Sequence, residues 1–165
     1  MALLIRILSN KSYHEPLEPD SAVGELAHVR GDAFKNFNTN NCRISIFRAD
    51  STEDVEEIVY AFAANREHVD KIDYCLADEV DFVDTNVEFE SNDAALKHPV
   101  IKKKHSDVCG LNASVLSDFL FVWVKRGKCF RISRAKVKSY LSSCIESGRY
   151  KKEWCSDSFL KNLGC

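Results

Sequence analysis

An imidazole, a carboxylate and a thiol alternate in the segment His105-Ser-Asp107-Val-Cys109. On a β-strand, side chains two residues apart point to the same face, so these three groups would form one row. Such a row could let Asp107 orient His105 as a general base, support a thiolate, or hold a metal. The structural alternative is a solvated His–Asp pair beside a buried Cys109. We take His105 and Asp107 as the candidate catalytic residues.

A second group of residues consists of carboxylates only. Asp81, Glu88 and Glu90 are spaced as D-x6-E-x-E across two expected strands, and carboxylate oxygens are the ligands that Mg²⁺ prefers. The order of helix, acidic strands, strand, helix and strand resembles the core of PD-(D/E)xK nucleases. The chain departs from that pattern because it has no Pro-Asp pair and has Glu90 in place of the lysine, so Lys102–Lys104 would have to supply the cation. A solvated acidic edge is the alternative.

The charges of the chain are divided along the sequence. Residues 1–99 carry a net charge of −11 and residues 100–165 a net charge of +9, which together give the formal −2. This asymmetry favours a nucleic-acid or acidic protein partner for the basic part, unless the two halves neutralise each other within the fold. Aromatic residues Trp123, Tyr140, Tyr150 and Trp154 are interleaved with it. The candidate binding residues are Lys102, Lys103, Lys104, Lys125, Arg126, Lys128, Arg131, Arg134 and Lys138.

Length and composition indicate one globular domain over residues 1–165. The chain is 45% apolar and 29% charged, which is too apolar for a disordered protein, and it has no apolar run long enough to cross a bilayer. The first residues lack the features of a secretory signal, so we expect a cytoplasmic protein without membrane contact. Seven cysteines, an odd number without a CxxC pair, predict reduced thiols. The common nucleotide-binding and hydrolase motifs are absent, and no cofactor is expected unless the nuclease alternative brings Mg²⁺.

The hydrophobic patterns predict a mixed α+β fold. It has a central sheet of about five to six strands with a C-terminal hairpin, flanked by two main helices. Ser51 followed by Asp54 forms a capping box for a helix that runs to about His68, and Ser133 caps a second helix, Arg134–Glu146. A short helix is expected from Asn112 or Ser114 to about Asp118. Further short helices are expected at Gly24–Phe34 and Ser158–Leu163. The expected strands are Leu3–Leu8, Cys42–Arg48, Lys71–Ala77, Val80–Val83, Val87–Phe89, His105–Leu111, and the hairpin of Phe119–Val124 with Cys129–Ile132.

The strand Cys42–Ala49, the capped helix after it and the His105-x-Asp107 segment resemble a group of small uncharacterised bacterial proteins over residues 30–118. The resemblance brings no activity and implies a bacterial or phage origin. We therefore expect a binding or accessory protein that engages a protein or nucleic acid through its basic C-terminal surface, in a setting such as defence or toxin immunity. The alternative is a hydrolase: a metal-dependent nuclease using Asp81, Glu88 and Glu90, or an enzyme with His105 as its base.

Overall fold

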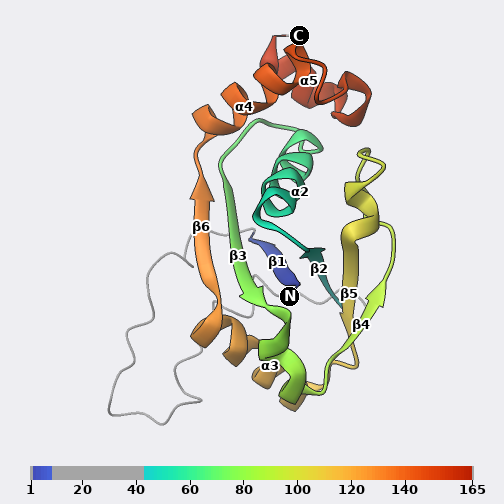
Figure 1. Ribbon diagram of the computed structural model, residues 1–165, viewed down its shortest axis with the longest axis vertical. Coiled ribbons are helices and arrows are strands. Elements are labelled where there is room, and N and C mark those ends of the chain that lie inside the picture. Colours follow the sequence, from blue (N-terminus) through green and yellow to red (C-terminus); the bar gives the residue numbers. More distant parts are fainter. Residues whose placement is uncertain (1, 9–42, 165) are drawn as a thin grey trace.

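The computed structural model describes residues 2–8 and 43–164, which form a mixed α+β fold around a six-stranded antiparallel sheet (Figure 1). The strand order is β4-β5-β2-β1-β3-β6, so the sheet has β4 at one edge and β6 at the other. This confirms the predicted fold class and strand number. The strands are β1 (Leu3–Leu8), β2 (Ile44–Ala49), β3 (Ile72–Asp78), β4 (Glu88–Ser91), β5 (His105–Cys109) and β6 (Lys128–Ile132).

Both faces of the sheet are covered, and alternate residues of each strand belong to different cores. On β1, Ile5 belongs to the cluster under α2 (Thr52–Ala64), α4 (Arg134–Glu146) and α5 (Asp157–Leu163), whereas its neighbour Leu4 belongs to the cluster under α3 (Ala113–Arg126). This is the period of two that a strand buried on both faces requires. Figure 1 shows α2 lying along the middle of the sheet, with α4 and α5 at one end and α3 at the other.

Helix α2 begins where the sequence predicted. The Ser51 side chain accepts a hydrogen bond from the Asp54 N–H (3.1 Å), and the Asp54 carboxylate accepts one from the Asp50 N–H (3.0 Å). These contacts satisfy N–H groups that have no partner inside the helix. Val55, Ile58 and Val59 are buried against the sheet, as their spacing indicates. The helix ends at Ala64 rather than near His68.

The predicted hairpin is wrong, because its first strand lies inside a helix. The run Phe119–Val124 is part of α3, and only β6 is a strand. The Asn112 side chain caps this helix by accepting from the N–H groups of residues 114 and 115 (3.0 Å each). Phe119, Leu120 and Trp123 are all buried, and Trp123 lies four residues after Phe119 and three after Leu120, which is the helical period. Aromatic and β-branched residues favour strands. This segment is nevertheless helical, because burial of one helical stripe outweighs that preference.

The expected strand Val80–Val83 is also wrong, because the chain forms the 3-10 helix η3 (Glu79–Thr85) there. Within Val80–Val83, only Phe82 is buried, and its ring lies 5.1 Å from that of Phe119. Val80 and Val83 are 55% and 73% exposed, so this segment lacks the buried apolar side chains of an interior strand. The predicted strands β3, β4 and β5 and the short helix α5 are present. Expected helix Gly24–Phe34 lies outside the described residues.

Two of the cysteines form a disulfide. Cys75 on β3 lies directly opposite Cys129 on β6, and their sulfurs are bonded. This differs from the expectation of reduced thiols throughout. The sequence shows no sign of the pairing, because the two cysteines are 54 residues apart and become neighbours only through the strand register. Among the described residues, no helix combines the length and the apolar character that a membrane span requires.

Candidate functional site

The candidate catalytic residues His105 and Asp107 lie on β5, on the α2 side of the sheet. The neighbouring strands β2 and β4 place further side chains beside them. In the antiparallel pairing of β2 with β5, Phe47 lies opposite His105 and Ser45 lies opposite Asp107. In the pairing of β5 with β4, Asp107 lies opposite Glu90. Side chains at paired positions point to the same face, so each strand contributes polar groups to one patch. The predicted row of alternating side chains on β5 is therefore present.

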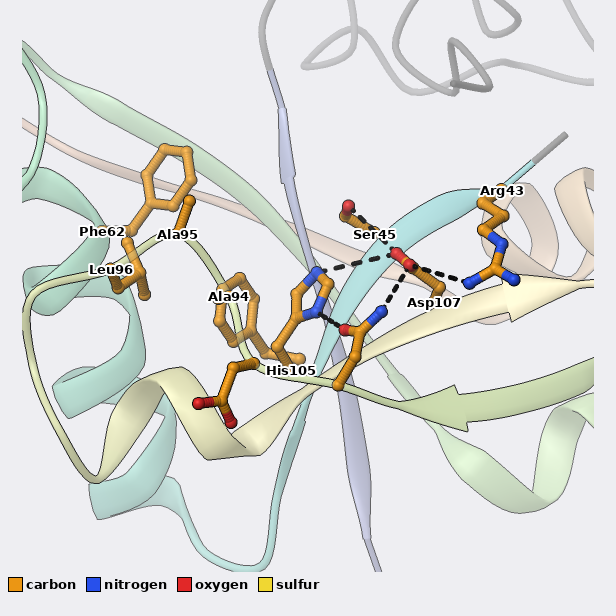
Figure 2. Close-up of a pocket in the computed structure, with 11 residues that line it drawn as sticks. Arg43, Ser45, Phe62, Ala94, Ala95, Leu96, His105 and Asp107 are labelled. Atoms are coloured by element: carbon orange, nitrogen blue, oxygen red, sulfur yellow. Dashed lines mark hydrogen bonds and ion pairs between the residues drawn. The ribbon is translucent and has the colours of Figure 1, made fainter. Parts of the chain in front are cut away.

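A cavity of about 410 Å³ opens beside this row (Figure 2). One wall is apolar, with Phe47 from β2, Phe62 from α2 and Ala94–Leu96 from the segment after β4. The opposite wall is polar and carries His105 and Asp107. A concave site with an apolar wall and a few converging polar groups is the usual form of a small-molecule site, and this volume lies in the usual range. The remaining lining residues are Arg43, Ser45, Asn92 and Asp93.

Asn92 connects the imidazole to the carboxylate. Its Nδ2 donates to Asp107 Oδ2 (2.6 Å), and its Oδ1 lies against Nδ1 of His105. Ser45 Oγ also donates to the same carboxylate, at Oδ1 (3.4 Å). Asp107 thus has two side-chain hydrogen-bond donors, one on β2 and one just beyond the end of β4, and Figure 2 shows Ser45 and His105 turned toward Asp107. The arrangement fixes the ring of His105 in one orientation.

His105 itself is nearly buried. Its side chain is 10% exposed and that of Asp107 is 15% exposed, and Nε2 of the ring lies 3.8 Å from Asp107 Oδ1. Burial lowers the pKa of His105 below its ordinary 6.5, although the nearby Asp107 carboxylate acts in the opposite direction. His105 is consequently neutral at pH 7 and can accept a proton or a hydrogen bond. The Phe47 ring packs against it edge-on at 5.2 Å.

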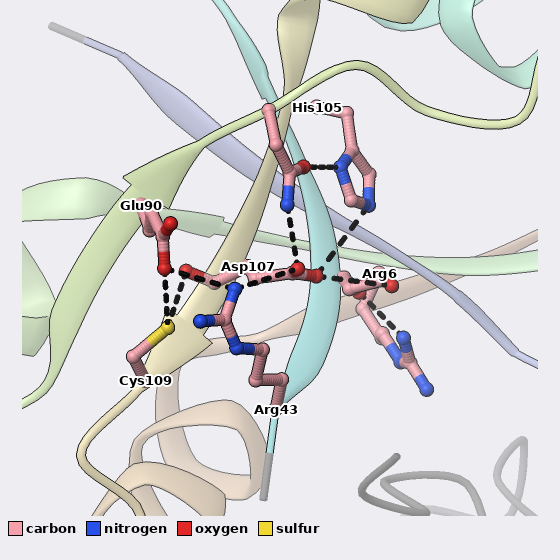
Figure 3. A network of polar contacts seen from close by, with 8 residues as sticks. Arg6, Arg43, Glu90, His105, Asp107 and Cys109 are labelled. Atoms are coloured by element: carbon pink, nitrogen blue, oxygen red, sulfur yellow. Dashed lines mark hydrogen bonds and ion pairs between the residues drawn. The ribbon is translucent and has the colours of Figure 1, made fainter. Parts of the chain in front are cut away.

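Cys109 does not have the environment of a reactive thiolate. Its Sγ donates to Glu90 Oε2 (3.5 Å), and Arg43 bridges that carboxylate (2.9 Å) and Asp107 (3.7 Å) (Figure 3). Desolvation raises the pKa of Cys109, and the hydrogen bond to Glu90 raises it further. The sulfur is therefore a protonated thiol at neutral pH, whereas a nucleophilic cysteine must be a thiolate.

The three carboxylates predicted as metal ligands lie on different elements. Asp81 is in η3, whereas Glu88 and Glu90 are on β4, with Glu90 engaged by Arg43. Within residues 2–8 and 43–164, no three His, Cys, Asp or Glu side chains are grouped so that they could hold a metal ion. The structure therefore does not bring Asp81, Glu88 and Glu90 together as one cation site.

The lysines at 102–104 lie on the 3-10 helix η4 (Ile101–Lys104), apart from the other candidate binding residues. Lys102 is paired with Asp93 (2.9 Å), and Lys104 with Asp54 (2.7 Å). Lys104 also holds the pKa of Asp54 below its usual value. Two of these three cations thus neutralise acids of the protein itself, as the structural alternative proposed.

The other candidate binding residues follow the edge of the sheet. We define the C-terminal basic surface as Lys125, Arg126, Lys128, Arg134, Lys136 and Lys138, all of which are exposed. They run from the end of α3 along β6 to the start of α4 (Figure 1). Arg131 differs, because its guanidinium binds the buried Asp73 across the strand pair through two bonds of 2.6 and 3.0 Å.

The aromatic residues expected on this surface are mostly core residues. Trp123 and Tyr150 are 3% and 8% exposed, and Tyr140 stacks on the buried Tyr60 at 3.8 Å. Phe130 on β6 is the exposed aromatic instead: it is 40% exposed and stacks on Tyr74 of β3 at 5.4 Å. Phe130 was not among the candidate binding residues predicted from the sequence, although the strand that carries it, Cys129–Ile132, was expected.

Comparisons with protein families, with curated proteins and with solved structures find no match to this chain. The layout resemblance over residues 30–118 therefore stays a prediction, and the site is interpreted from its own geometry. Two residues of the site carried no signal in the sequence. Asn92 lies between two expected strands, Val87–Phe89 and His105–Leu111, and Phe62 lies in the helix expected after Ser51 without being singled out as a candidate site residue.

Proposed function

We propose that this protein binds single-stranded nucleic acid through the C-terminal basic surface. The observation that carries the proposal concerns five of the six cations of this surface. Among the described residues, no carboxylate pairs with Arg126, Lys128, Arg134, Lys136 or Lys138. Cations that no carboxylate of the described residues pairs with can bind phosphates, and this binding releases condensed counterions.

The local backbone supports an anionic partner at one end of this surface. Helix α4 begins beside Arg134 and Lys136 and has no acidic residue in its first turn. The positive end of a helix macrodipole normally attracts carboxylates, so basic residues at this end add to the positive potential instead of offsetting it. The opposite end is formed by Lys125 and Arg126, which lie in the last turn of α3.

The exposed aromatic residue favours a nucleic acid over an acidic protein. Phe130 lies two residues from Lys128 on β6, so both side chains point to the same face of the edge strand. An aromatic ring beside cations can stack an unpaired base while the cations bind the backbone. An acidic protein needs only the cations, whereas an unpaired base uses the ring as well. The proposed role is that of an accessory protein in the cytoplasm.

The deciding experiment measures binding of a fluorescent single-stranded oligonucleotide by anisotropy at several salt concentrations. The test variant is Arg126→Gln/Lys128→Gln/Arg134→Gln. The matched control is Lys103→Gln/Lys152→Gln/Lys161→Gln, which removes three positive charges elsewhere on the exposed surface. For single strands each phosphate contact contributes about 0.7 to the slope of log K against log salt, so the test variant should lose about 2 from that slope.

The control has the same net charge as the test variant but should keep the wild-type slope, because its three charges lie outside the C-terminal basic surface. Equal losses in both variants would mean that only net charge matters, and the proposal would fail. Binding of an acidic polypeptide with no binding of oligonucleotide would also overturn it, and would support the protein-partner alternative. Hydrolysis of the oligonucleotide during the assay would point to the enzyme alternative.

A further inference from the structure

The cavity beside His105 presents hydrogen-bond acceptors, and the positions of the protons show which atoms they are. One of them, Asp107 Oδ1, also accepts from Ser45 Oγ (3.4 Å). An ionised carboxylate only accepts hydrogen bonds, so the atom of Asn92 that lies 2.6 Å from Asp107 Oδ2 must be its amide nitrogen. The amide oxygen of Asn92 then faces His105 Nδ1. That oxygen accepts, so Nδ1 must carry the proton. In the neutral ring, Nε2 therefore presents a lone pair.

This lone pair lies beside a second acceptor. His105 Nε2 and Asp107 Oδ1 are 3.8 Å apart, which is too far for a direct hydrogen bond. We call these two atoms the acceptor pair. His105 is more than nine-tenths buried, so the low exposure makes an unsatisfied acceptor costly. A donor group placed in the cavity can reach both atoms at ordinary hydrogen-bond lengths.

The charges around the cavity favour a cationic donor. Arg43 is 2.9 Å from Glu90 and 3.7 Å from Asp107, so its closer partner is Glu90. Asp93 is neutralised by Lys102 at 2.9 Å. Of the charged residues that line the cavity, this leaves Asp107 without a closer ion partner; Arg6 on β1 also acts on His105 but does not line the cavity. A carboxylate inside a partly dehydrated site attracts a cation more strongly than it does in water.

The opposite wall sets the rest of the ligand. Phe62 and Leu96 offer apolar surface on the side of the cavity away from Ser45, Asp107 and Arg43, as Figure 2 shows. Phe47 lies beside His105 instead. We propose that this cavity binds a small organic amine, with its ammonium group on His105 Nε2 and Asp107 Oδ1 and an apolar substituent against Phe62. This site is separate from the C-terminal basic surface, and the proposal does not depend on nucleic-acid binding.

The probe is phenethylammonium chloride, titrated into the full chain at pH 7.5 and followed by calorimetry and by the NMR signals of His105. Two comparison compounds keep the phenyl group and change the head: 3-phenylpropionate carries a negative charge and 2-phenylethanol is neutral. The ammonium compound should bind in the millimolar range usual for a ligand of this size, and about tenfold or more tighter than either comparison compound. The NMR signals of His105 should shift with saturation.

Asp107→Asn tests the carboxylate directly, because it keeps the shape of the side chain while removing its charge and placing a donor in the acceptor pair. It should weaken the ammonium compound about tenfold or more. Glu88→Gln is the matched control: it removes one negative charge from β4, at an exposed residue that does not line the cavity, and should leave binding within about twofold.

The comparison of the three compounds on the wild-type protein tests the proposal even if Asp107→Asn does not fold. Equal or tighter binding of 3-phenylpropionate would overturn the proposal. So would binding of the ammonium compound without any shift at His105, because that would place it elsewhere. Absence of binding for all three compounds would mean that water fills the acceptor pair, and the proposal would be wrong.

Discussion

The amide oxygen of Asn92, one residue beyond the end of β4, lies against Nδ1 of His105, the first residue of β5. The backbone N–H of Asn92 also donates to the His105 carbonyl (3.3 Å), so the two residues are held together twice. This contact is the reason that the ring of His105 has one proton position and one direction in the cavity.

The first prediction concerns that proton. At pH 7.5, His105 should be the Nδ1–H tautomer, because Asn92 can only accept at that position. His98 should be the opposite tautomer, since its Nδ1 accepts from the Ile101 N–H (3.2 Å). Long-range ¹H–¹⁵N NMR spectra distinguish the two forms, and the two rings calibrate each other in one spectrum. Asn92→Ala should release His105 to the other tautomer and leave His98 unchanged; two rings of the same form in the wild type would contradict the prediction.

Stability should fall on mild acidification. Burial lowers the pKa of both His98 and His105 from 6.5, so the unfolded chain takes up protons at a higher pH than the folded chain does. The free energy of unfolding should therefore decrease as the pH drops through 6.5, and level off below the folded-state pKa values, with a slope of at most one proton per histidine. Urea unfolding between about pH 7.5 and 5.5 measures this.

The double variant His98→Gln/His105→Gln checks the origin of that slope. It should flatten the curve in this window, because it removes both histidines, whereas Asp54, whose pKa is lowered chiefly by its hydrogen bond to Lys104, loses its contribution only at lower pH. If the double variant keeps the wild-type slope, groups other than His98 and His105 cause the pH dependence of stability.

Phe130 should matter for binding and little for folding. Replacing it with Ala removes a half-exposed ring from an edge strand, and should weaken a single-stranded oligonucleotide by about 1–3 kcal/mol. Anisotropy titrations at constant salt measure the loss. The salt slope should stay that of the wild type, because no charge is removed. An unchanged affinity would remove the argument for a nucleic acid over an acidic protein.

The disulfide should stabilise the fold. Cys75 and Cys129 close a loop of 54 residues in sequence separation, and a bond that constrains the unfolded chain in this way contributes about 2–4 kcal/mol. Cys75→Ala/Cys129→Ala should lower the unfolding free energy by that amount, and a reductant should do the same to the wild type but not to the variant. Mass spectrometry after alkylation without reductant checks the bond itself, since alkylation of both thiols would show that they are reduced.

Phe119 tests whether the core under α3 supports the whole fold. It is fully buried, so Phe119→Ala should cost about 3–5 kcal/mol of unfolding free energy. The control is Val83→Ala in η3, where the side chain is 73% exposed and the change should stay within about 0.5 kcal/mol. Chemical denaturation measures both. A small effect at Phe119 would mean that the α3 side is loosely packed.

The sequence alone determined the features that depend on residues close together in the chain. Ser51 and Asp54 predicted the start of α2, because a helix cap is specified by residues three positions apart in the chain. The strand predicted at Cys42–Arg48 is likewise present as β2 (Ile44–Ala49), since a strand is specified by residues two positions apart.

Tertiary structure decided what depends on strand register and burial. Phe119–Val124 has the composition of a strand, and became helical because one helical stripe of it packs against the sheet and Phe82. Asp73 with Arg131, and Asn92 with His105, meet only across paired or adjoining strands. Contacts between residues far apart in sequence are set by the register of the whole sheet, and no local pattern of residues encodes that register.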